Sequence, residues 1–459
     1  MNIFRRKDLT ALLATGKRQT LPKTLGAFDL VILGIGCIIG TGIFVLTGVA
    51  AANFAGPAIT LSFILSGSAC GFAALAYAEL AAMIPIAGSA YTFSYVALGE
   101  IVAFAVGWAI ICEYTIGAAA VAAGWSGYMI GLLKSIGIRI PKAITAVPAD
   151  GGIINLPAII IVCLLTYFLI LGTRESAKLN KILVLIKLSV VTLFLILATP
   201  HVNPLNWNPF LPFGFKGIAA GAAIVFFAYI GFDAVATAAE ECKNPNKDLP
   251  TGIIGSLIIC TVLYIAVAAV LTGVVPYSQL STSEPVAFAL RYIGLNFGSA
   301  IVGIGAICGI TTVLLGFIFG QTRVFLAMAR DGLLPEKAAR LHPQYKTPYL
   351  VTLTTGLGVA FLSGLLPIKV IAELTNAGTL FAFITVSVGV LVLRKTHPAS
   401  KRPFRCPAVT VIAPLAVILC GYLMVNLPRE TWVFFGCWSL LGMIVYCLYG
   451  RRHSLLGKS

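Results

Sequence analysis

Residues 33–44 read Leu-Gly-Ile-Gly-Cys-Ile-Ile-Gly-Thr-Gly-Ile-Phe, and this stretch is the most informative part of the chain. It places four glycines inside an apolar run that is long enough to cross a lipid bilayer. Backbone N–H and C=O groups cannot stay unpaired in lipid, so a break in such a run must face protein or a water-filled cavity. The backbone groups that the break frees can then bind a polar ligand.

The composition is that of an integral membrane protein. The chain has 459 residues, of which 59% are hydrophobic and 10% charged, whereas a soluble domain carries about 25% charged residues. A spanning helix takes about 20 apolar residues, and the sequence predicts about twelve such helices. They are predicted at 26–50, 57–84, 100–130, 155–172, 180–199, 216–240, 252–275, 298–322, 348–366, 372–393, 408–427 and 431–449.

Short connections between the spans predict a single membrane domain. We expect a cytoplasmic segment at 1–25, which is either an amphipathic helix or a solvated arm. A core of ten helices follows at 26–395, then two more helices at 396–450 and a cytoplasmic tail at 451–459.

The basic residues are distributed as the topology of a membrane protein requires. With the N-terminus inside, 24 of the 32 lysines and arginines fall on the cytoplasmic side, 7 fall outside, and Lys187 lies within a span. This positive-inside bias predicts an even number of spans, with both termini in the cytoplasm of a multi-pass cell-membrane protein. It also explains the net charge of +16 without nucleic-acid binding, since topology and anionic lipids account for it.

The sixth predicted span repeats the irregularity of the first. Its run Phe226-Phe227-Ala228-Tyr229-Ile230-Gly231-Phe232-Asp233 is interrupted by a tyrosine, a glycine and an acid. Spans one and six are corresponding members of two five-helix halves. Paired interruptions at corresponding positions indicate an inverted-repeat transporter and its binding site. The predicted fold is therefore all-α, with two inverted five-helix repeats in which helices 1 and 6 are unwound.

The glycine run has two other interpretations. Its spacing, G-x-G-x-x-x-G-x-G, is not that of a dinucleotide fingerprint, and no strand precedes it. Gly36 and Gly40 form a small-xxx-small step that would serve helix packing alone. The matching break in helix 6 favours a broken helix, with Gly34 and Gly36 serving packing and Gly40 and Gly42 opening the backbone to a ligand.

The predicted breaks offer sites for both charges of a zwitterion. Thr41 and Gly42 begin the second half of helix 1 and present N–H groups that suit a carboxylate. Carbonyl groups that suit an ammonium come from the end of the first half and from helix 6. Those carbonyls belong to Ile38, Phe227, Ala228 and Ile230. This pair of sites fits the head group of an α-amino acid.

Ionisable residues within spans are functional candidates, because burying them is costly. Lys187 lies too deep in its span to reach the interface, so we expect it to load and release a proton during transport. Its ammonium would also fill the place of a sodium ion. Glu113 and Asp233 are the next candidates, while Glu79 is expected in a structural network and Asp29 at the cap of helix 1. No metal spacing, C-x-x-C pair or nucleophile–base set is present in the sequence, so no cofactor, metal or enzymatic activity is expected.

Seven motifs together resemble the amino acid–polyamine–organocation superfamily, and most closely the bacterial members of its cationic amino acid transporter group. They are GIGCIIGTGIF (34–44), GPAITLSFILSG (56–67), YAEL (77–80), GSAYTFSYVALGE (88–100), FFAYIGFDAVATAAEE (226–241), GITTVLLGFIFGQTR (309–323) and ARDGLLP (329–335). They run through nearly the whole chain in the order of the family.

The resemblance implies a LeuT-like five-plus-five fold, alternating access and amino acid uptake coupled to protons. It implies a substrate site at Ile38, Ile39, Thr41, Gly42, Phe227, Ala228 and Ile230. Lys187 matches the buried lysine that is proposed to replace sodium, Glu113 and Asp233 match acidic positions, and Phe317 is expected to face the pocket. Bacterial members of the group often carry neutral substrates, so we expect neutral L-amino acids.

Three functional hypotheses follow. The first is a proton-coupled L-amino acid symporter, the second an amino acid exchanger, and the third a receptor or channel without alternating access. Expected partners are the amino acid, membrane lipids and, as an open possibility, a small membrane accessory subunit.

Overall fold

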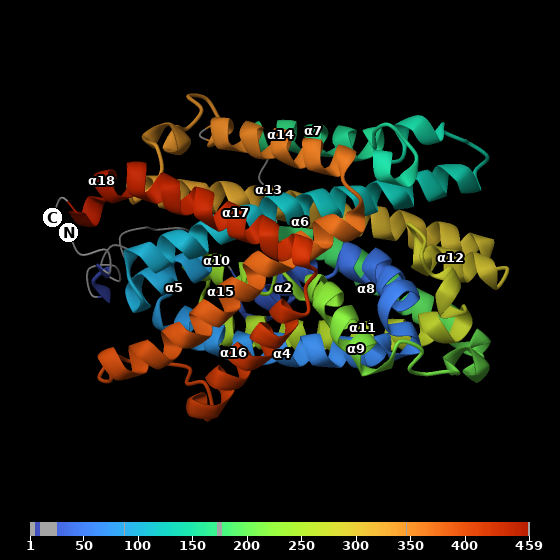
Figure 1. Ribbon diagram of the computed structural model, residues 1–459, viewed down its shortest axis with the longest axis horizontal. Coiled ribbons are helices and arrows are strands. Elements are labelled where there is room, and N and C mark those ends of the chain that lie inside the picture. The colour runs from blue at the N-terminus through green and yellow to red at the C-terminus, as the bar shows by residue number, and fades with distance from the viewer. Residues whose placement is uncertain (1–4, 10–24, 87, 172–176, 346, 458–459) are drawn as a thin grey trace.

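The computed structural model describes residues 5–9, 25–86, 88–171, 177–345 and 347–457, and within these ranges the chain is helical with no β-strand. The main helices run along the long axis of the molecule (Figure 1). They are α2 (Ala27–Ile38), α4 (Ile59–Met83), α6 (Glu100–Ser135), α7 (Leu156–Ile170), α8 (Ala177–Ala198), α9 (Gly214–Val225), α11 (Pro245–Val274), α13 (Asn296–Arg330), α14 (Tyr349–Leu365), α15 (Ile368–Thr396), α16 (Val409–Val425) and α17 (Arg429–Val445).

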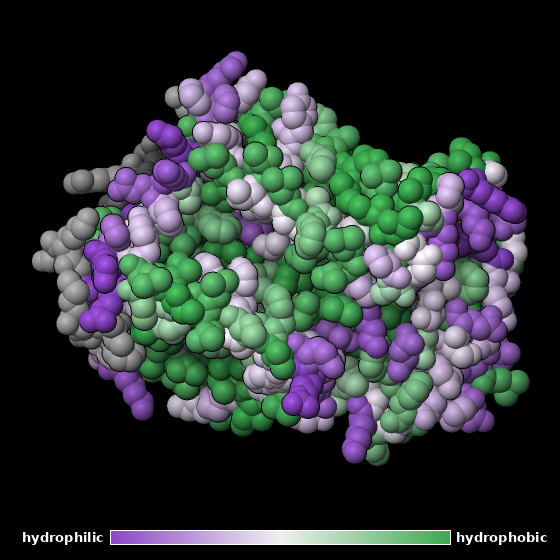
Figure 2. Space-filling view, turned by 45° about the horizontal axis from the view of Figure 1, so that its top comes forward, coloured by the Kyte–Doolittle hydropathy of each residue, from purple (hydrophilic) through white to green (hydrophobic). Residues whose placement is uncertain are grey.

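These helices confirm a multi-pass membrane protein. Within the described ranges, eight helical segments are long and apolar enough to cross a membrane, and four more apolar helices are shorter. Apolar side chains dominate the middle of the face in Figure 2, and hydrophilic side chains gather at its two ends and along part of its lower edge. Two short helices were not predicted, α5 (Ser89–Ala97) and α12 (Pro285–Tyr292), because each lies between spans and is too short to show a clear period.

Helix 1 is broken where its glycines are densest. The α2 helix ends at Ile38, Ile39 is extended with ψ 106°, and helical structure resumes at Thr41 and continues as a π-helix over Gly42–Leu46. At its start, Gly26 N–H donates to Asp29 Oδ2 at 2.9 Å, which confirms the predicted cap.

Helix 6 is broken at the corresponding place. The α9 helix passes into a 3-10 turn at Phe226–Tyr229, Ile230 is extended with ψ 133°, and α10 (Ala234–Thr237) begins after Asp233. Both unwound helices of the predicted fold are confirmed.

Corresponding helices of the two halves pack against each other. The α4 helix contacts α11, α6 contacts α13, and α7 contacts α14, the last pair lying side by side along one edge of the molecule (Figure 1). In the predicted inverted repeat these pairs are helices 2 and 7, 3 and 8, and 4 and 9. Each of these helices of the first half therefore contacts the corresponding helix of the second half. The α16 and α17 helices lie outside this arrangement, and the span Arg429–His453 is only 17% buried.

The two ends of the described chain meet at one place. Lys7 forms an ion pair with Asp331 at 2.7 Å, and Leu455 N–H donates to the carbonyl of Asp331 at 3.1 Å. Both ends therefore lie on one side of the bundle, as an even number of spans requires. Most of the predicted N-terminal segment, 10–24, lies outside the described residues.

Candidate substrate and proton site

The breaks in helices 1 and 6 lie directly against each other. A Cβ atom on Gly42 would come within 2.4 Å of the Cα of Ala228, and one on Gly231 would come within 2.8 Å of the carbonyl oxygen of Cys37. Gly231 also has φ +120°, a conformation that side chains disfavour. Glycine is thus required at both positions for the two breaks to approach.

The glycines of the opening stretch have more packing duties than expected. A Cβ on Gly34 would meet Ser256 of α11 at 2.4 Å, so its predicted packing role is confirmed. A Cβ on Gly40 would meet Val313 of α13 at 3.0 Å. Protein atoms therefore lie where a side chain on Gly40 or Gly42 would, so both glycines also serve packing, and the expectation that they open the backbone to a ligand stays a prediction. The sequence could not show this, since the neighbours come from distant helices.

Lys187 reaches the carboxyl-terminal end of α2. Its side chain is 0% exposed and its Nζ donates to the carbonyl oxygen of Gly36 at 2.6 Å. The aliphatic part of the Lys187 side chain packs against α13 at Gly309, where the helix has no side chain. A Cβ on Gly309 would lie 2.8 Å from Lys187 Cγ. A cation is favourable at this end of a helix, where carbonyl groups lack helical partners. The buried lysine is thus tied directly to the break in helix 1.

Tyr264 on α11 joins the two breaks. Its hydroxyl lies 2.9 Å from the carbonyl oxygen of Ile38 and 2.9 Å from that of Ala228. A hydroxyl carries one hydrogen, so it satisfies these two acceptors only in part. Both carbonyls belong to the predicted ammonium site. Tyr264 was not predicted, although a tyrosine inside the apolar run of span seven was the available signal.

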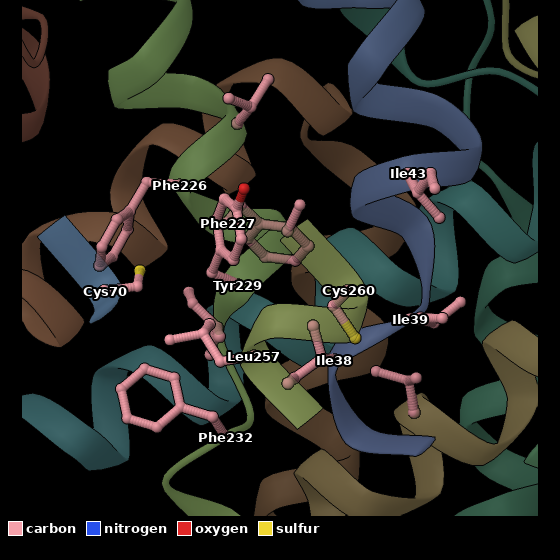
Figure 3. Close-up of a cluster of buried hydrophobic side chains, with 14 of the residues drawn as sticks. Ile38, Ile39, Ile43, Cys70, Phe226, Phe227, Tyr229, Phe232, Leu257 and Cys260 are labelled. Carbon is pink, nitrogen blue, oxygen red and sulfur yellow. The ribbon is translucent and has the colours of Figure 1, made fainter. Parts of the chain in front are cut away.

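The predicted head-group residues converge on this junction. All seven are buried: Ile38, Ile39, Thr41, Gly42, Phe227, Ala228 and Ile230. Figure 3 shows the side chains of Ile38 and Ile39 leaving the break on opposite sides, with Ile38 directed toward Leu257 and Cys260. Thr41 turns its hydroxyl toward the carbonyl of Val121 at 3.5 Å. The first N–H groups of the helix that resumes at Thr41 have no acceptor within that helix.

The two predicted acidic residues lie together beside the break in helix 6. Glu113 and Asp233 are 3% and 6% exposed and close enough to interact electrostatically. Tyr114 Oη lies 3.5 Å from Asp233 Oδ2. Asp233 Oδ1 is buried and has no hydrogen-bond partner within the described part of the chain. An unpaired buried acceptor of this kind suits a bound donor, such as a water or a ligand N–H.

Phe317 faces the same region from α13. Its ring packs edge-on against Tyr114 with centroids 5.5 Å apart, and a Cβ on Gly117 would touch it at 2.9 Å. Phe317 also follows Val313, the neighbour of Gly40, by one helical turn and so shares its face. Phe317 therefore lies beside Tyr114, on the face of α13 that also meets Gly40.

Glu79 lies away from the junction, in the structural network that was predicted for it. It accepts hydrogen bonds from Arg394 Nε at 3.0 Å, Arg394 Nη2 at 2.6 Å and the backbone N–H of Cys406 at 2.8 Å.

Within the described ranges, no group of three or more metal-ligating side chains is present.

Comparison with known proteins agrees with this architecture. A family model described as amino acid permease matches residues 25–450. The methylthioribose transporter of Bacillus subtilis (strain 168) is 49% identical over 459 residues, covering 100% of both chains. The branched-chain amino acid permease BcaP of the same organism is 50% identical over 463 residues, covering 100% of this chain and 99% of BcaP. The chloroplastic cationic amino acid transporter 9 of Arabidopsis thaliana is 35% identical over 512 residues, covering 95% and 89%. The chain therefore belongs to the amino acid permease family.

Proposed function

We propose that this permease carries neutral L-amino acids into the cell together with a proton. The observation that carries the proposal is the junction itself. Helix 1 presents N–H groups after its break and carbonyl groups before it, and the carbonyl of Gly36 binds the buried amine of Lys187. The backbone groups proposed to bind the zwitterion and the carbonyl that binds the Lys187 amine thus belong to the same broken helix.

The head group of an amino acid matches what the junction lacks. Tyr264 supplies one hydrogen to two carbonyls, and Asp233 Oδ1 has no donor within the described chain. An α-ammonium carries three N–H donors and so supplies hydrogens where acceptors are in excess. The carboxylate would take the N–H groups at Thr41 and Gly42.

The side chain of the substrate is proposed to face Phe317 and Tyr114. These rings form a compact apolar wall, which favours short or branched apolar side chains over long charged ones. The 50% identity to a branched-chain amino acid permease over the whole chain supports this range.

Methylthioribose is a second candidate substrate, because the transporter of that name is 49% identical to the chain over its whole length. Methylthioribose carries no ammonium and no carboxylate. It would leave unused the paired acceptors and N–H groups on which our proposal rests, so the amino acid is the preferred assignment.

Uptake into proteoliposomes tests the proposal. One labelled branched-chain amino acid is competed with each standard amino acid and with methylthioribose, at two pH values. We expect neutral amino acids to compete and an inward pH gradient to drive net accumulation. Uptake that requires an amino acid inside the vesicle would establish an exchanger. Saturable binding without accumulation would indicate a receptor, and flux far above carrier rates a channel.

We further propose that both termini lie in the cytoplasm, on the side where the described ends meet at Asp331. The 24 lysines and arginines assigned to that side support this orientation. A small accessory subunit stays a prediction.

A further inference from the structure

A basic cavity opens where α15 ends and the chain turns toward α16. It has a volume of about 190 Å³ and is lined by Arg394, Pro398, Arg402 and Arg405. The turn lies toward the end of the molecule at which α18 (Arg451–His453) is found (Figure 1). Gly389 on α15 packs against Ala97 of α5, and Tyr91 of α5 bonds Asp331 at 2.6 Å. The cavity is therefore on the side that we propose to be cytoplasmic.

The cavity carries excess positive charge. Arg394 and Arg402 share one carboxylate, that of Glu79, at 2.6 Å and 3.3 Å. Arg405 makes no ion pair within the described part of the chain. The segment 394–405 contains five lysines and arginines and no aspartate or glutamate. One buried carboxylate thus pairs with two of the three guanidinium groups that line the cavity, and the wall attracts an anion.

The lining is held in place before any ligand arrives. The side chain of Arg402 is 6% exposed and donates through its Nη atoms to the carbonyls of Leu393, His397 and Ser400 at 2.8–3.0 Å. Arg394 donates to the carbonyl of Cys406 at 3.0 Å. These bonds leave Arg394 Nη1 and the whole guanidinium of Arg405 as donors that bond nothing in the described ranges. Free guanidinium donors match phosphate geometry, and the bonds of Arg402 and Arg394 hold the backbone of the turn that carries them.

The helix that leaves the cavity presents an apolar face. Val411, Ile418 and Val425 follow one another at seven-residue intervals on α16 and are 55%, 63% and 72% exposed. In a membrane-spanning helix such a face lies against acyl chains. A phosphate at the cavity is therefore next to the surface along which its own acyl chains would run.

We propose that this cavity binds the phosphate of an anionic phospholipid of the inner leaflet. The guanidinium donors of Arg405 and Arg394 hold the phosphate oxygens, while the acyl chains follow the Val411 face of α16. A basic pocket between helices at the cytoplasmic surface is a general form of lipid site. The phosphate offsets the charge that Glu79 leaves unbalanced and secures the junction of α4, α15 and α16.

The test uses the full-length protein purified in neutral detergent. Thermal stability and retained lipid, the latter measured by native mass spectrometry, are followed with phosphatidylglycerol, phosphatidylcholine or inorganic phosphate. We expect phosphatidylglycerol alone to raise the melting temperature and to remain bound. In Arg405→Gln the apparent affinity for phosphatidylglycerol should fall about fivefold, since one arginine near the surface contributes about 1 kcal/mol.

A matched variant separates this site from general cationic attraction. Arg452 is exposed on α18 at the same end of the protein, and Arg452→Gln removes the same charge away from the cavity. It should leave the affinity for phosphatidylglycerol unchanged. Equal weakening by both variants would overturn the proposal, and so would equal effects of phosphatidylglycerol and phosphatidylcholine. Saturation by inorganic phosphate that blocks phosphatidylglycerol would replace the lipid with a soluble anion.

Discussion

Replacing Lys187 by methionine should disconnect transport from the proton gradient. The change keeps the length of the stem that packs against Gly309 but removes the amine that lies 2.6 Å from the carbonyl of Gly36. Leaving that buried carbonyl without this donor costs about 1–3 kcal/mol. The variant also no longer buries an ammonium, which offsets much of this loss. We therefore expect Lys187→Met to fold.

The size of the expected loss follows if Lys187 carries one proton in each transport cycle. A gradient of one pH unit supplies about 1.36 kcal/mol per proton, which is a tenfold concentration ratio. At zero membrane potential, wild-type proteoliposomes should concentrate a labelled neutral amino acid about tenfold per pH unit. Lys187→Met vesicles should reach only the external concentration, although exchange of labelled for unlabelled substrate persists.

Lys181→Met is the control, because it removes a lysine from the same helix. Lys181 pairs with Asp29 and its side chain is 42% exposed, so the pair contributes at most about 1 kcal/mol. Its accumulation ratio should match the wild type. Tenfold accumulation by Lys187→Met would refute the coupling role of this amine, and an equal loss in Lys181→Met would show that the effect is not specific.

Three further changes test the junction. Tyr264→Phe removes the hydroxyl hydrogen that two carbonyls share. It should lower the free energy of unfolding by about 1–3 kcal/mol and weaken substrate binding in thermal-shift titrations. Unchanged stability would mean that the hydroxyl bonds neither carbonyl. Gly231→Ala forces a side chain onto φ +120° and should destabilise by about 2 kcal/mol or more in thermal melts, whereas Gly303→Ala, where a Cβ meets nothing within 4 Å, should be neutral or stabilising. Phe317→Ala enlarges the space beside Tyr114 and should let longer apolar amino acids compete in uptake; an unaltered competition panel would place Phe317 outside the pocket.

The broken helices and the buried lysine could be predicted because the signal for each lies within one short stretch of sequence. Glycines, a tyrosine and an acid interrupt apolar runs at Gly40 and Gly231, and a lone lysine in a span stands out against its neighbours. What fills the space beside Gly42 could not be predicted, because Ala228 is distant in sequence. The same is true of Tyr264, whose two acceptors belong to different halves of the chain.

Glu79 shows the same division between local and distant information. Its place near the inner end of span two suggested a structural network, and that prediction is confirmed. Its partners Arg394 and Arg402 lie more than 300 positions away, in a segment that the sequence predicts as a cytoplasmic loop. Such an arrangement is fixed by the packing of α4 against α15, which single-sequence patterns do not encode.

The single ammonium bonded to Gly36 also has an electrical consequence. A neutral amino acid is a zwitterion, so on the proposed coupling each cycle moves one net positive charge inward. A membrane potential of 100 mV, negative inside, then contributes about 2.3 kcal/mol per cycle, or roughly a fortyfold concentration ratio. The voltage across the membrane would therefore drive uptake even where the two compartments have the same pH, and a voltage clamp would record substrate arrival as an inward current.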